Sequence, residues 1–324
     1  MQQPRLLFGH SAAIAKLLDE CGRYARTAYP ILVLGQRGSG KSALARHIHE
    51  LSGRSGAFVH ESAAAIPEHL EVAHLGGHAR GSFTGAVADR MGLLEAAHGG
   101  TFFLDELALA SPRVQEILLQ VLDGQLRRLG EVRDRRIDVR LIAATNIELV
   151  ELIERGEFRR DLLERFGYLV LRMPPLAERR DEILPLADHF FRSESERLGL
   201  TARPILSAEV RACLLAAPWS GNIRELEAVC RYAILHAAPN EEIVLADLPP
   251  EFLASAGEVL QFRHQRSLAE RARLALAETQ GNKAAAARLL GISRRHMHRI
   301  LAASSLMMCW EVGDLAPLLS VLSQ

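Results

Sequence analysis

Aromatic residues, cysteines and lysines are scarce in this sequence. Aromatic side chains make up 5% of the 324 residues although hydrophobic residues make up 48%, so we expect a core of Leu, Ala, Ile and Val in helices and buried parallel strands. The four cysteines are widely spaced without a Cys-x-x-Cys pair, which argues against a disulfide framework or a zinc site and fits a reducing cytosol. Lysine occurs only at positions 16, 41 and 283, so Arg supplies nearly all of the positive charge.

The sequence also lacks segments that direct a protein into or across a membrane. The first residues, Met1 to Gly9, are few and include Pro4 and Arg5, which does not resemble a secretory signal. No apolar run reaches the roughly 18 residues of a membrane-spanning helix. We therefore expect a cytoplasmic protein with no membrane partner.

Charge is unevenly distributed along a chain whose formal net charge is zero. Residues 262–303 contain nine Arg or Lys side chains and only two acidic ones. A basic end on a neutral chain is typical of a segment that binds nucleic acid. Double-stranded DNA is therefore a predicted partner.

The apolar runs predict an α/β region followed by helices. Short runs at Ile31–Leu34, Thr101–Leu104 and Val139–Ala144 are typical of buried strands, and helical patterns separate them, as at Val114–Leu122. This alternation indicates a parallel sheet. From about Pro174 onward we expect no further strands, only helices.

These patterns divide the chain into five segments. The α/β part takes residues 1–173 and an all-helical part takes residues 174–252. Residues 253–266 form a linker, and residues 267–303 form a compact helical unit. The apolar segment 304–324 is a tail of unknown role.

Residues 35–42 form a candidate phosphate-binding loop. They are Gly-Gln-Arg-Gly-Ser-Gly-Lys-Ser, which fits the pattern Gly-x-x-x-x-Gly-Lys-Ser/Thr between a strand and a helix. Glycines let backbone N–H groups surround phosphate oxygens, lysine reaches the β and γ phosphates, and the hydroxyl holds Mg²⁺. The predicted nucleotide contacts are Gly35, Gly38, Ser39, Gly40, Lys41 and Ser42. The alternative is a glycine-rich turn without a ligand.

Two acidic residues follow the apolar run at Thr101. Asp105 and Glu106 are adjacent at the end of a predicted buried strand, where carboxylates need a cation or water. Asp105 is the predicted second Mg²⁺ ligand, and Glu106 is the predicted catalytic residue that polarises the attacking water. The alternative is an acidic cap at the start of a helix.

Further polar residues lie where they could contact a nucleotide. Asn146 follows the strand that ends near Ala144, at the edge of the sheet where ligands bind, although a turn-forming Asn is the alternative. Arg159 and Arg165 lie near one helix end and could stabilise a transferring phosphoryl group. From the residues alone, exposed helical arginines are the preferred explanation. Arg224 follows the turn Trp219-Ser-Gly-Asn and could face the nucleotide.

The basic C-terminal unit has the pattern of a helix-turn-helix. Asn282 and Ser293 are good helix N-caps, and Gly291 ends the helix before the turn. We predict a small core that includes Ala286, Leu289, Leu290, Ile292, Ile300 and Leu301. The second helix carries the predicted DNA contacts, which are Ser293, Arg294, Arg295, His296, His298 and Arg299. The alternative is a basic helix with no role in DNA binding.

Together these motifs resemble the AAA+ domain of sigma-54-dependent activators, the bacterial enhancer-binding proteins. The most specific element is Gly81-Ser-Phe-Thr-Gly-Ala86, which differs from the hallmark Gly-Ala-Phe-Thr-Gly-Ala of that family at its second residue. Gly92-Leu-Leu-Glu-Ala-Ala-His-Gly-Gly-Thr101 follows it, and the resemblance extends from about Phe8 to Ala302.

The resemblance carries expectations for fold and site residues. It implies a P-loop AAA+ domain with a parallel sheet flanked by helices, an α-helical lid, and a C-terminal all-α helix-turn-helix domain of the Fis type. It implies that Phe83 and Thr84 contact sigma-54, that Arg159 and Arg165 act on the nucleotide of a neighbouring subunit, and that Arg224 is a sensor in the lid. It further implies a self-assembled ring, expected to be a hexamer.

The chain departs from the family pattern at several positions. Ser62 stands where the family usually has an Asn that couples the γ-phosphate to the catalytic Glu. Ala79 stands where a Glu precedes the loop, and the phosphate loop carries Arg37. The chain starts almost at the ATPase domain, so we expect no N-terminal regulatory domain, and control by a trans-acting regulatory protein or by expression level.

The preferred function is an ATPase that activates transcription. It would bind upstream DNA and use ATP with Mg²⁺ to remodel sigma-54 RNA polymerase and open promoters. The first alternative is a DNA-binding regulator with an AAA+ fold that no longer remodels sigma-54, which Ser62 and Ala79 favour. The second alternative is a general AAA+ remodeller of another protein, against which the helix-turn-helix argues.

Overall fold

The computed structural model describes residues 11–200, 205–237, 242–257, 275–276, 279, 282–290 and 297. The chain forms two compact units. Unit 1 comprises Met1–Leu206 and Trp219–Ile243, and unit 2 comprises Ser207–Pro218 and Val244–Gln324. The predicted DNA contacts, from Ser293 to Arg299, lie outside the described residues, as do Gly291, Ile292, Ile300 and Leu301.

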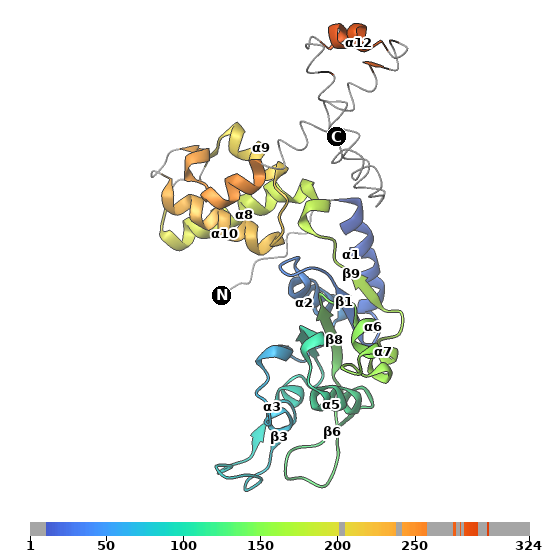
Figure 1. The fold of residues 1–324 in the computed structure, drawn as a ribbon. Helices are drawn as coiled ribbons and strands as arrows, with labels where there is room; N and C mark the ends of the chain where they lie inside the picture. Colours follow the sequence, from blue (N-terminus) through green and yellow to red (C-terminus); the bar gives the residue numbers. More distant parts are fainter. Residues whose placement is uncertain are drawn as a thin grey trace, which may run out of the picture. The chain divides into compact units, whose positions relative to one another are not determined.

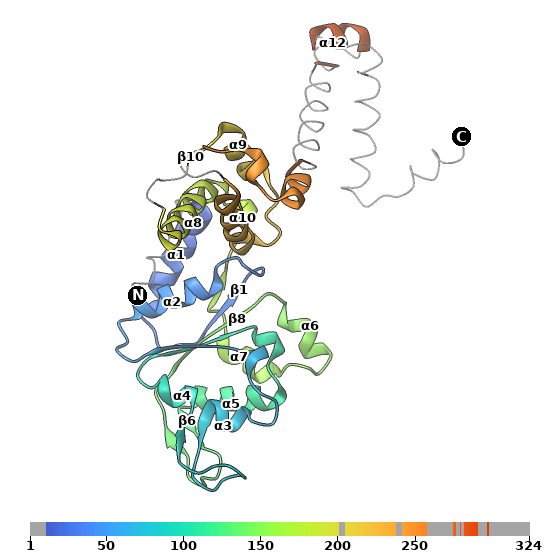
Figure 2. The same ribbon diagram turned by 90° about the vertical axis from the view of Figure 1, so that its left-hand side faces the viewer.

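Unit 1 combines a sheet, helices on both of its faces, two small hairpins and a pair of helices (Figures 1 and 2). Its helices are α1 (Ala12–Ala25), α2 (Lys41–Ser52), α3 (Glu71–Gly76), α4 (Leu93–Ala96), α5 (Pro112–Leu122), α6 (Leu149–Glu154), α7 (Arg160–Phe166), α8 (Ile183–Leu198) and α10 (Asn222–His236). Short 3-10 turns are η1 (Ala63–Ala65), η2 (Leu107–Leu109), η3 (Leu176–Glu178) and η4 (Arg180–Glu182). Its strands are β1 (Ile31–Leu34), β2 (Phe58–Ser62), β3 (Gly77–His78), β4 (Arg90–Met91), β5 (Thr101–Asp105), β6 (Gln125–Leu126), β7 (Arg135–Arg136), β8 (Arg140–Thr145), β9 (Val170–Arg172), β10 (Ile205–Leu206) and β11 (Glu242–Ile243).

The central sheet has five parallel strands in the order β2-β5-β8-β1-β9. Leu34 pairs with Thr145, and Ser62 pairs with Asp105. The carboxyl ends of these four strands therefore lie at one edge of the sheet, which is where ligands bind in open α/β folds. The predicted parallel sheet is confirmed, and the sequence patterns had indicated three of its strands, β1, β5 and β8.

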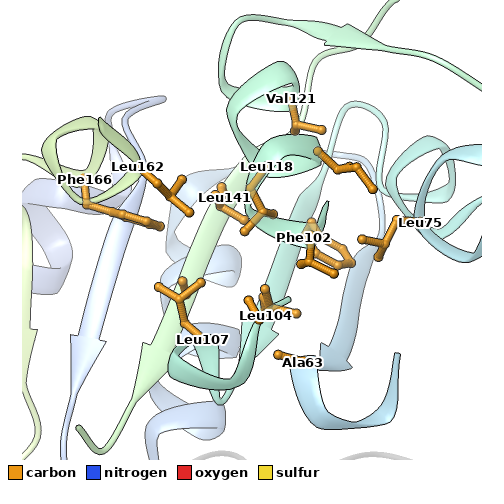
Figure 3. Packing of buried hydrophobic residues seen from close by; sticks show 14 of the residues in the cluster. Ala63, Leu75, Phe102, Leu104, Leu107, Leu118, Val121, Leu141, Leu162 and Phe166 are labelled. Carbon is orange, nitrogen blue, oxygen red and sulfur yellow. The ribbon is translucent and has the colours of Figure 1, made fainter. Parts of the chain in front are cut away.

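Hydrophobic clusters cover both faces of the sheet because the strand residues alternate between them. On one face, Leu32, Phe102 and Leu141 pack against α3, α5 and α7 (Figure 3). On the other face, Ile31 and Phe103 pack against α1 and α2. All residues of β1 and β8 are buried, which explains why β1 is a continuous apolar run and why Leu141–Ala144 of β8 are all apolar.

Two antiparallel hairpins lie beyond α3 and α5 (Figure 1). The first joins β3 to β4, and the second joins β6 to β7. A bridge between His78 and Leu129 connects them, and the Ala79 N–H donates to Leu129 O at 3.0 Å. The Gly81–Ala86 motif lies at the tip of the first hairpin.

The segment after Pro174 contains the long helices α8 and α10, which pack against each other. The prediction that no strand occurs there was wrong in one respect. Ile205 pairs with Glu242, and Leu206 pairs with Ile243, in a two-residue parallel ladder between β10 and β11. Strands this short carry no periodicity that a sequence pattern could reveal.

Unit 2 is helical in its described part. It contains α9 (Ala208–Ala216), the 3-10 turn η5 (Leu245–Asp247), a helix over residues 250–257 and α12 (Lys283–Leu289). Asn282 caps α12 as predicted, since its Oδ1 accepts from the N–H groups of Ala284 and Ala285 at 3.1 Å.

The core of unit 2 around α12 differs from the prediction at one position. Ala286 and Ala287 pack with Ala275 and Met297, and Leu290 joins them. Leu289 was predicted to lie in this core, but its side chain is 58% exposed. The buried face of α12 runs through residues 286, 287 and 290, so Leu289 lies on the other side of the helix.

Among the described residues of both units, no helix is long and apolar enough to span a membrane.

Candidate active site

The phosphate loop connects β1 to α2 at the carboxyl edge of the sheet. Gly38 and Gly40 have φ angles of 72° and 105°, which glycine adopts without strain. Lys41 begins α2 and is 8% exposed. Its Nζ donates to Gly35 O at 2.9 Å and to Gln36 O at 3.1 Å. The backbone of the loop therefore holds the ammonium group of Lys41.

The turn before α10 packs directly on this loop. The Ile223 N–H donates to Gly38 O at 2.9 Å. A Cβ added to Gly38 would lie 2.4 Å from Gly221 O and 3.1 Å from the Cβ of Arg224. Position 38 therefore needs glycine because of the close approach as well as the positive φ. Arg224, which the sequence analysis expects to face the nucleotide, lies next to the phosphate loop.

Asn222 fixes the turn to the loop, and sequence reasoning gave it no role. It is fully buried with a φ of 56°. Its Nδ2 donates to Gln36 Oε1 and to Arg37 O, each at 3.1 Å, and its Oδ1 accepts from the Leu176 N–H at 2.7 Å. Asn tolerates this left-handed backbone better than most residues. The Trp-Ser-Gly-Asn turn was visible in the sequence, but its partners were not.

The two predicted acidic residues lie beside the loop. Asp105 ends β5, and its Oδ2 accepts from Ser42 Oγ at 3.3 Å. Its Oδ1 accepts from the Glu106 N–H at 2.9 Å. Glu106 has a φ of 55°, a left-handed backbone that is uncommon for Glu and concentrates at functional sites.

Two side chains hold the carboxylate of Glu106. Arg37 Nη2 donates to its Oε1 at 2.9 Å, and Ser62 Oγ donates to its Oε2 at 2.9 Å. Ser62, at the end of β2, therefore contacts the predicted catalytic residue from the position where the related family has Asn. Arg37 is a contact that the sequence motif could not reveal, because its position in the pattern accepts any residue.

Burial and four charged side chains act on the pKa of Lys41. Burial lowers the pKa of Lys41, and the nearby carboxylates of Asp105 and Glu106 oppose that shift. Arg224 and Arg37 lower the pKa of Lys41 further. The structure therefore gathers two acids and three cations at one point, although they come from three separate parts of the chain.

A buried ion pair contacts the backbone of the phosphate loop. Arg179 Nη1 donates to Glu182 Oε2 at 3.0 Å, and both side chains are 1% exposed. Arg179 Nη2 also donates to Ser39 O. Burial lowers the pKa of Arg179, and Glu182 opposes that shift. Sequence reasoning missed this pair, since nothing in a run of charged residues reveals which ones are buried.

These residues fit a nucleoside triphosphate with Mg²⁺. Among the described residues, the buried Ser39 Oγ has no hydrogen-bond partner, and such a group in a glycine-lined loop can bond a phosphate oxygen. The oxygens of Ser42 and Asp105 lie 3.3 Å apart. Hydroxyl and carboxylate oxygens are the ligands that Mg²⁺ takes beside phosphates.

Asn146, Arg159 and Arg165 were also predicted to act on the nucleotide. Gly35 N–H donates to Thr145 O at 3.2 Å, so the exposed Asn146 follows a residue that contacts the loop. Arg159 pairs with Asp161 at 2.7 Å, and Arg165 pairs with Asp123 at 2.7 Å. The structure does not join these two arginines to the phosphate loop. Both are about half exposed; Arg165 lies on α7, and Arg159 is the N-cap of that helix.

The Gly81–Ala86 motif forms a tight exposed turn. Gly81 and Gly85 have φ angles of 77° and 104°, and the Gly81 N–H donates to Ala86 O at 2.8 Å. This turn presents Phe83, which is 39% exposed, and the exposed Thr84 on the hairpin tip. The ring of Phe83 contacts His78 edge-on with centroids 5.0 Å apart.

Three family models match successive parts of the chain. Residues 7–172 match the sigma-54 interaction domain, and residues 177–262 match the AAA+ ATPase lid domain. Residues 273–302 match the bacterial regulatory proteins of the Fis family. The sheet and the phosphate loop lie within the first match, and the Asn222 turn lies within the second.

The chain is similar to several bacterial regulators over most of its length. The DNA-binding transcriptional regulator NtrC of Escherichia coli (strain K12) is 37% identical over 326 residues, which cover 91% of this chain and 69% of NtrC. The nitric oxide reductase transcription regulator NorR2 of Cupriavidus necator is 39% identical over 328 residues, which cover 91% of this chain and 62% of NorR2. The sigma54-dependent transcriptional activator SfnR of Pseudomonas putida is 45% identical over 222 residues, which cover 68% of this chain and 60% of SfnR.

Solved structures of related proteins have a similar fold. Crystal structures of NtrX from Brucella abortus include a complex with ATP, which has a TM-score of 0.69 and 31% identity and covers 93% of this chain and 69% of that one. The complex of NtrX with ADP has a TM-score of 0.71 and 30% identity and covers 92% of this chain and 69% of that one. The predicted fold class is confirmed, and the chain belongs to the family of sigma-54-dependent transcriptional activators, with a sigma-54 interaction domain of the AAA+ ATPase type, a helical lid and a Fis-type helix-turn-helix domain.

Proposed function

We propose that this protein hydrolyses ATP and uses the energy to remodel RNA polymerase that carries sigma-54, so that promoters open. One observation carries the proposal. The chain presents Phe83 and Thr84 on an exposed hairpin tip, in a unit that also holds a complete phosphate loop and a paired carboxylate site. An apolar ring held at an exposed tip by two glycines indicates a partner surface.

At the nucleotide site, each residue has a proposed role. Gly35, Gly38, Ser39 and Gly40 surround the phosphates, and Lys41 neutralises the β and γ phosphates. Glu106 orients and polarises the attacking water, since its carboxylate lies at the carboxyl edge of the sheet beside Asp105. Asn146 and Arg224 contact the γ-phosphate from the sheet and from the lid.

Ser42 and Asp105 would hold Mg²⁺, which neutralises charge on the phosphates when bound. This assignment follows from the 3.3 Å contact between their oxygens and from the preference of Mg²⁺ for such ligands.

Arg159 and Arg165 act in trans in this proposal. Arg165 lies on α7 and Arg159 is its N-cap. Each pairs with a half-exposed carboxylate, and such surface pairs contribute only about 0–1 kcal/mol, so both arginines are available to the nucleotide of a neighbouring subunit. An arginine supplied by a neighbour stabilises the charge that develops on the transferring phosphoryl group. Such an arrangement requires a head-to-tail contact between subunits, which closes into a ring when its rotation allows, and we propose a hexameric ring.

The remaining proposals concern DNA binding, domain boundaries and location. Residues 267–303 would bind DNA upstream of the promoter, with contacts from Ser293, Arg294, Arg295, His296, His298 and Arg299. We further propose the boundaries 1–173 for the ATPase part, 174–252 for the lid and 253–266 for the linker. The protein would act in the cytoplasm.

Promoter opening is the direct test. Purified protein is mixed with sigma-54 RNA polymerase and a sigma-54 promoter, and unpaired thymines are detected with permanganate. Melting is expected with ATP but not with a non-hydrolysable analogue, and not with Glu106→Gln. Glu151→Gln, which changes an exposed carboxylate on α6, is the matched control and should melt the promoter normally. ATP hydrolysis without melting by the unmodified protein would instead favour a DNA-binding regulator that does not remodel sigma-54.

A further inference from the structure

Three consecutive hydrogen bonds extend from Glu106 to α3. Ser62 Oγ donates to Glu106 Oε2 at 2.9 Å, and the Ser62 N–H donates to Glu61 Oε1 at 2.9 Å. The second oxygen of Glu61, Oε2, lies 2.9 Å from His74 Nε2. A line of short polar contacts therefore runs from the proposed catalytic residue through the end of β2 to a helix outside the nucleotide site.

The polar groups along this line divide into hydrogen-bond donors and acceptors. A carboxylate accepts hydrogen bonds, so the contact between His74 Nε2 and Glu61 Oε2 is a hydrogen bond in the ring tautomer whose Nε2–H donates. Both oxygens of Glu61 are then engaged, one by the backbone of β2 and one by α3. The side chains of His74 and Glu61 are 32% and 19% exposed, so water screens this contact less than it screens a surface pair.

His74 lies on the helix that leads into the Phe83 loop. α3 ends at Gly76, and β3 follows at once with Gly77 and His78. The ring of His78 contacts that of Phe83. Leu75 holds α3 in the core beside β5 (Figure 3).

The joint between α3 and the hairpin leaves little room for independent movement. A Cβ added to Gly77 would lie 2.5 Å from Arg90 O, and one added to Gly76 would lie 2.8 Å from Arg127 O. The Leu129 N–H donates to Gly77 O at 2.9 Å. A displacement of α3 therefore moves the bases of both hairpins together, because closely packed backbone shifts as a unit.

We infer that Glu61 and His74 are positioning residues that couple the Glu106 carboxylate to the loop carrying Phe83 and Thr84. The inference rests on the proposed function, in which that loop contacts sigma-54. When Glu106 turns toward a nucleotide-bound water, Ser62 loses its acceptor, and β2, Glu61 and α3 adjust in sequence. Ser62 is the first residue of this route after Glu106, at the position where the resemblance implies an Asn.

A simpler role for the pair is structural. The His74–Glu61 contact would then only attach α3 to β2, and its loss would lower stability or loop order equally in every nucleotide state. Coupling is a difference between states, so a claim of coupling needs a measurement in two states.

The test measures binding of the full chain to purified sigma-54 in the presence of ADP and of ADP with aluminium fluoride, a mimic of the hydrolysis transition state. The variants are His74→Leu and His74→Gln, where Gln keeps a donor for Glu61. His69→Asn is the control, since it removes an exposed imidazole from the same segment and Asn tolerates the φ of 65° found there. ATP turnover and thermal unfolding are measured on the same samples.

His74→Leu is expected to remove the preference for the transition-state mimic, a loss of about tenfold or more in the affinity ratio. A fall in ATP turnover with no change in this affinity ratio would overturn the inference, because the pair would then act on hydrolysis and not on the loop. His74→Gln should recover most of the preference, and His69→Asn should retain all of it.

A double-mutant comparison sharpens the result. If Ser62 and His74 lie on one route, then Ser62→Ala combined with His74→Leu loses no more of the affinity ratio than the larger single loss. Additive losses would overturn the inference, and so would a full preference in His74→Leu or an equal drop in binding in both nucleotide states. If the unmodified protein binds sigma-54 in neither state, the proposed function itself fails, and the inference falls with it.

Discussion

The buried ion pair between Arg179 and Glu182 provides a stability prediction that the structure makes quantitative. Both side chains are 1% exposed, and Arg179 also donates to Ser39 O in the phosphate loop. Glu182 Oε1 accepts from Ser11 Oγ at 3.4 Å, and Ser11 caps α1. One pair therefore ties the start of the lid to the phosphate loop and to α1. Arg179→Met keeps much of the side-chain volume but removes the cation that faces Glu182.

The expected loss follows from the burial of the remaining carboxylate. Removing one partner of a buried ion pair costs about 3–5 kcal/mol, whereas replacing both by apolar residues is often nearly neutral. One kcal/mol shifts the Tm by about 2–4 °C in a unit of this size. Arg179→Met should therefore lower the Tm by about 6–20 °C. Arg179→Met with Glu182→Leu should recover most of that loss, apart from about 1 kcal/mol for the hydrogen bond to Ser39 O.

Circular dichroism during heating measures these shifts on the full chain. Arg192→Met on α8 is the matched control, because its pair with Asp188 has side chains 53% and 48% exposed and contributes only about 0–1 kcal/mol. The reasoning fails if Arg179→Met melts with the control. It also fails if the double variant is as unstable as the single one.

Three further predictions concern the nucleotide site. Glu106→Gln should bind ATP with a Kd within about twofold of the unmodified protein by calorimetry but hydrolyse it at least about 100-fold more slowly, since a general base contributes that much; unchanged turnover would exclude Glu106 as the base. Arg37→Gln should lower kcat about fivefold in a phosphate-release assay, because it removes one half-exposed ion pair worth about 1 kcal/mol from the Glu106 carboxylate, and an unaltered kcat would mean that this pair does not position Glu106. Gly38→Ala should raise the Kd for ATP about tenfold or more, because a left-handed backbone costs Ala about 1–2 kcal/mol and its Cβ would lie 2.4 Å from Gly221 O; a Kd equal to that of Gly22→Ala, where nothing lies within 4 Å of the added Cβ, would contradict the tight packing.

The central strands were predictable because burial on both faces leaves apolar runs, as in β1 and in Leu141–Ala144 of β8. β2 was not, since His60 and Glu61 interrupt its apolar residues and every residue of the strand is at least partly exposed. Its position at the edge of the sheet permits this composition. β9 has only three residues, which is too short for any period to emerge.

In the nucleotide site too, some features were predictable from the sequence and others were not. The phosphate loop and the Asp105–Glu106 pair were predictable because their chemistry requires fixed residue types at local spacing. The contacts of Asn222 with Gln36 and of Arg179 with Ser39 join residues far apart in the sequence. Their partners are set by how the lid packs on the sheet, which no local pattern encodes. The Glu61–His74 contact belongs to this second group.

Binding of the purified protein to sigma-54 is the measurement that tests the central claim most directly. It is made with ATP, with ADP and aluminium fluoride, and without nucleotide, for the unmodified protein and for Thr84→Ala. We predict binding that depends on the nucleotide and is lost in Thr84→Ala, because the exposed Gly81–Ala86 turn is the proposed contact. Absence of binding in every state, with ATP hydrolysis intact, would contradict the account.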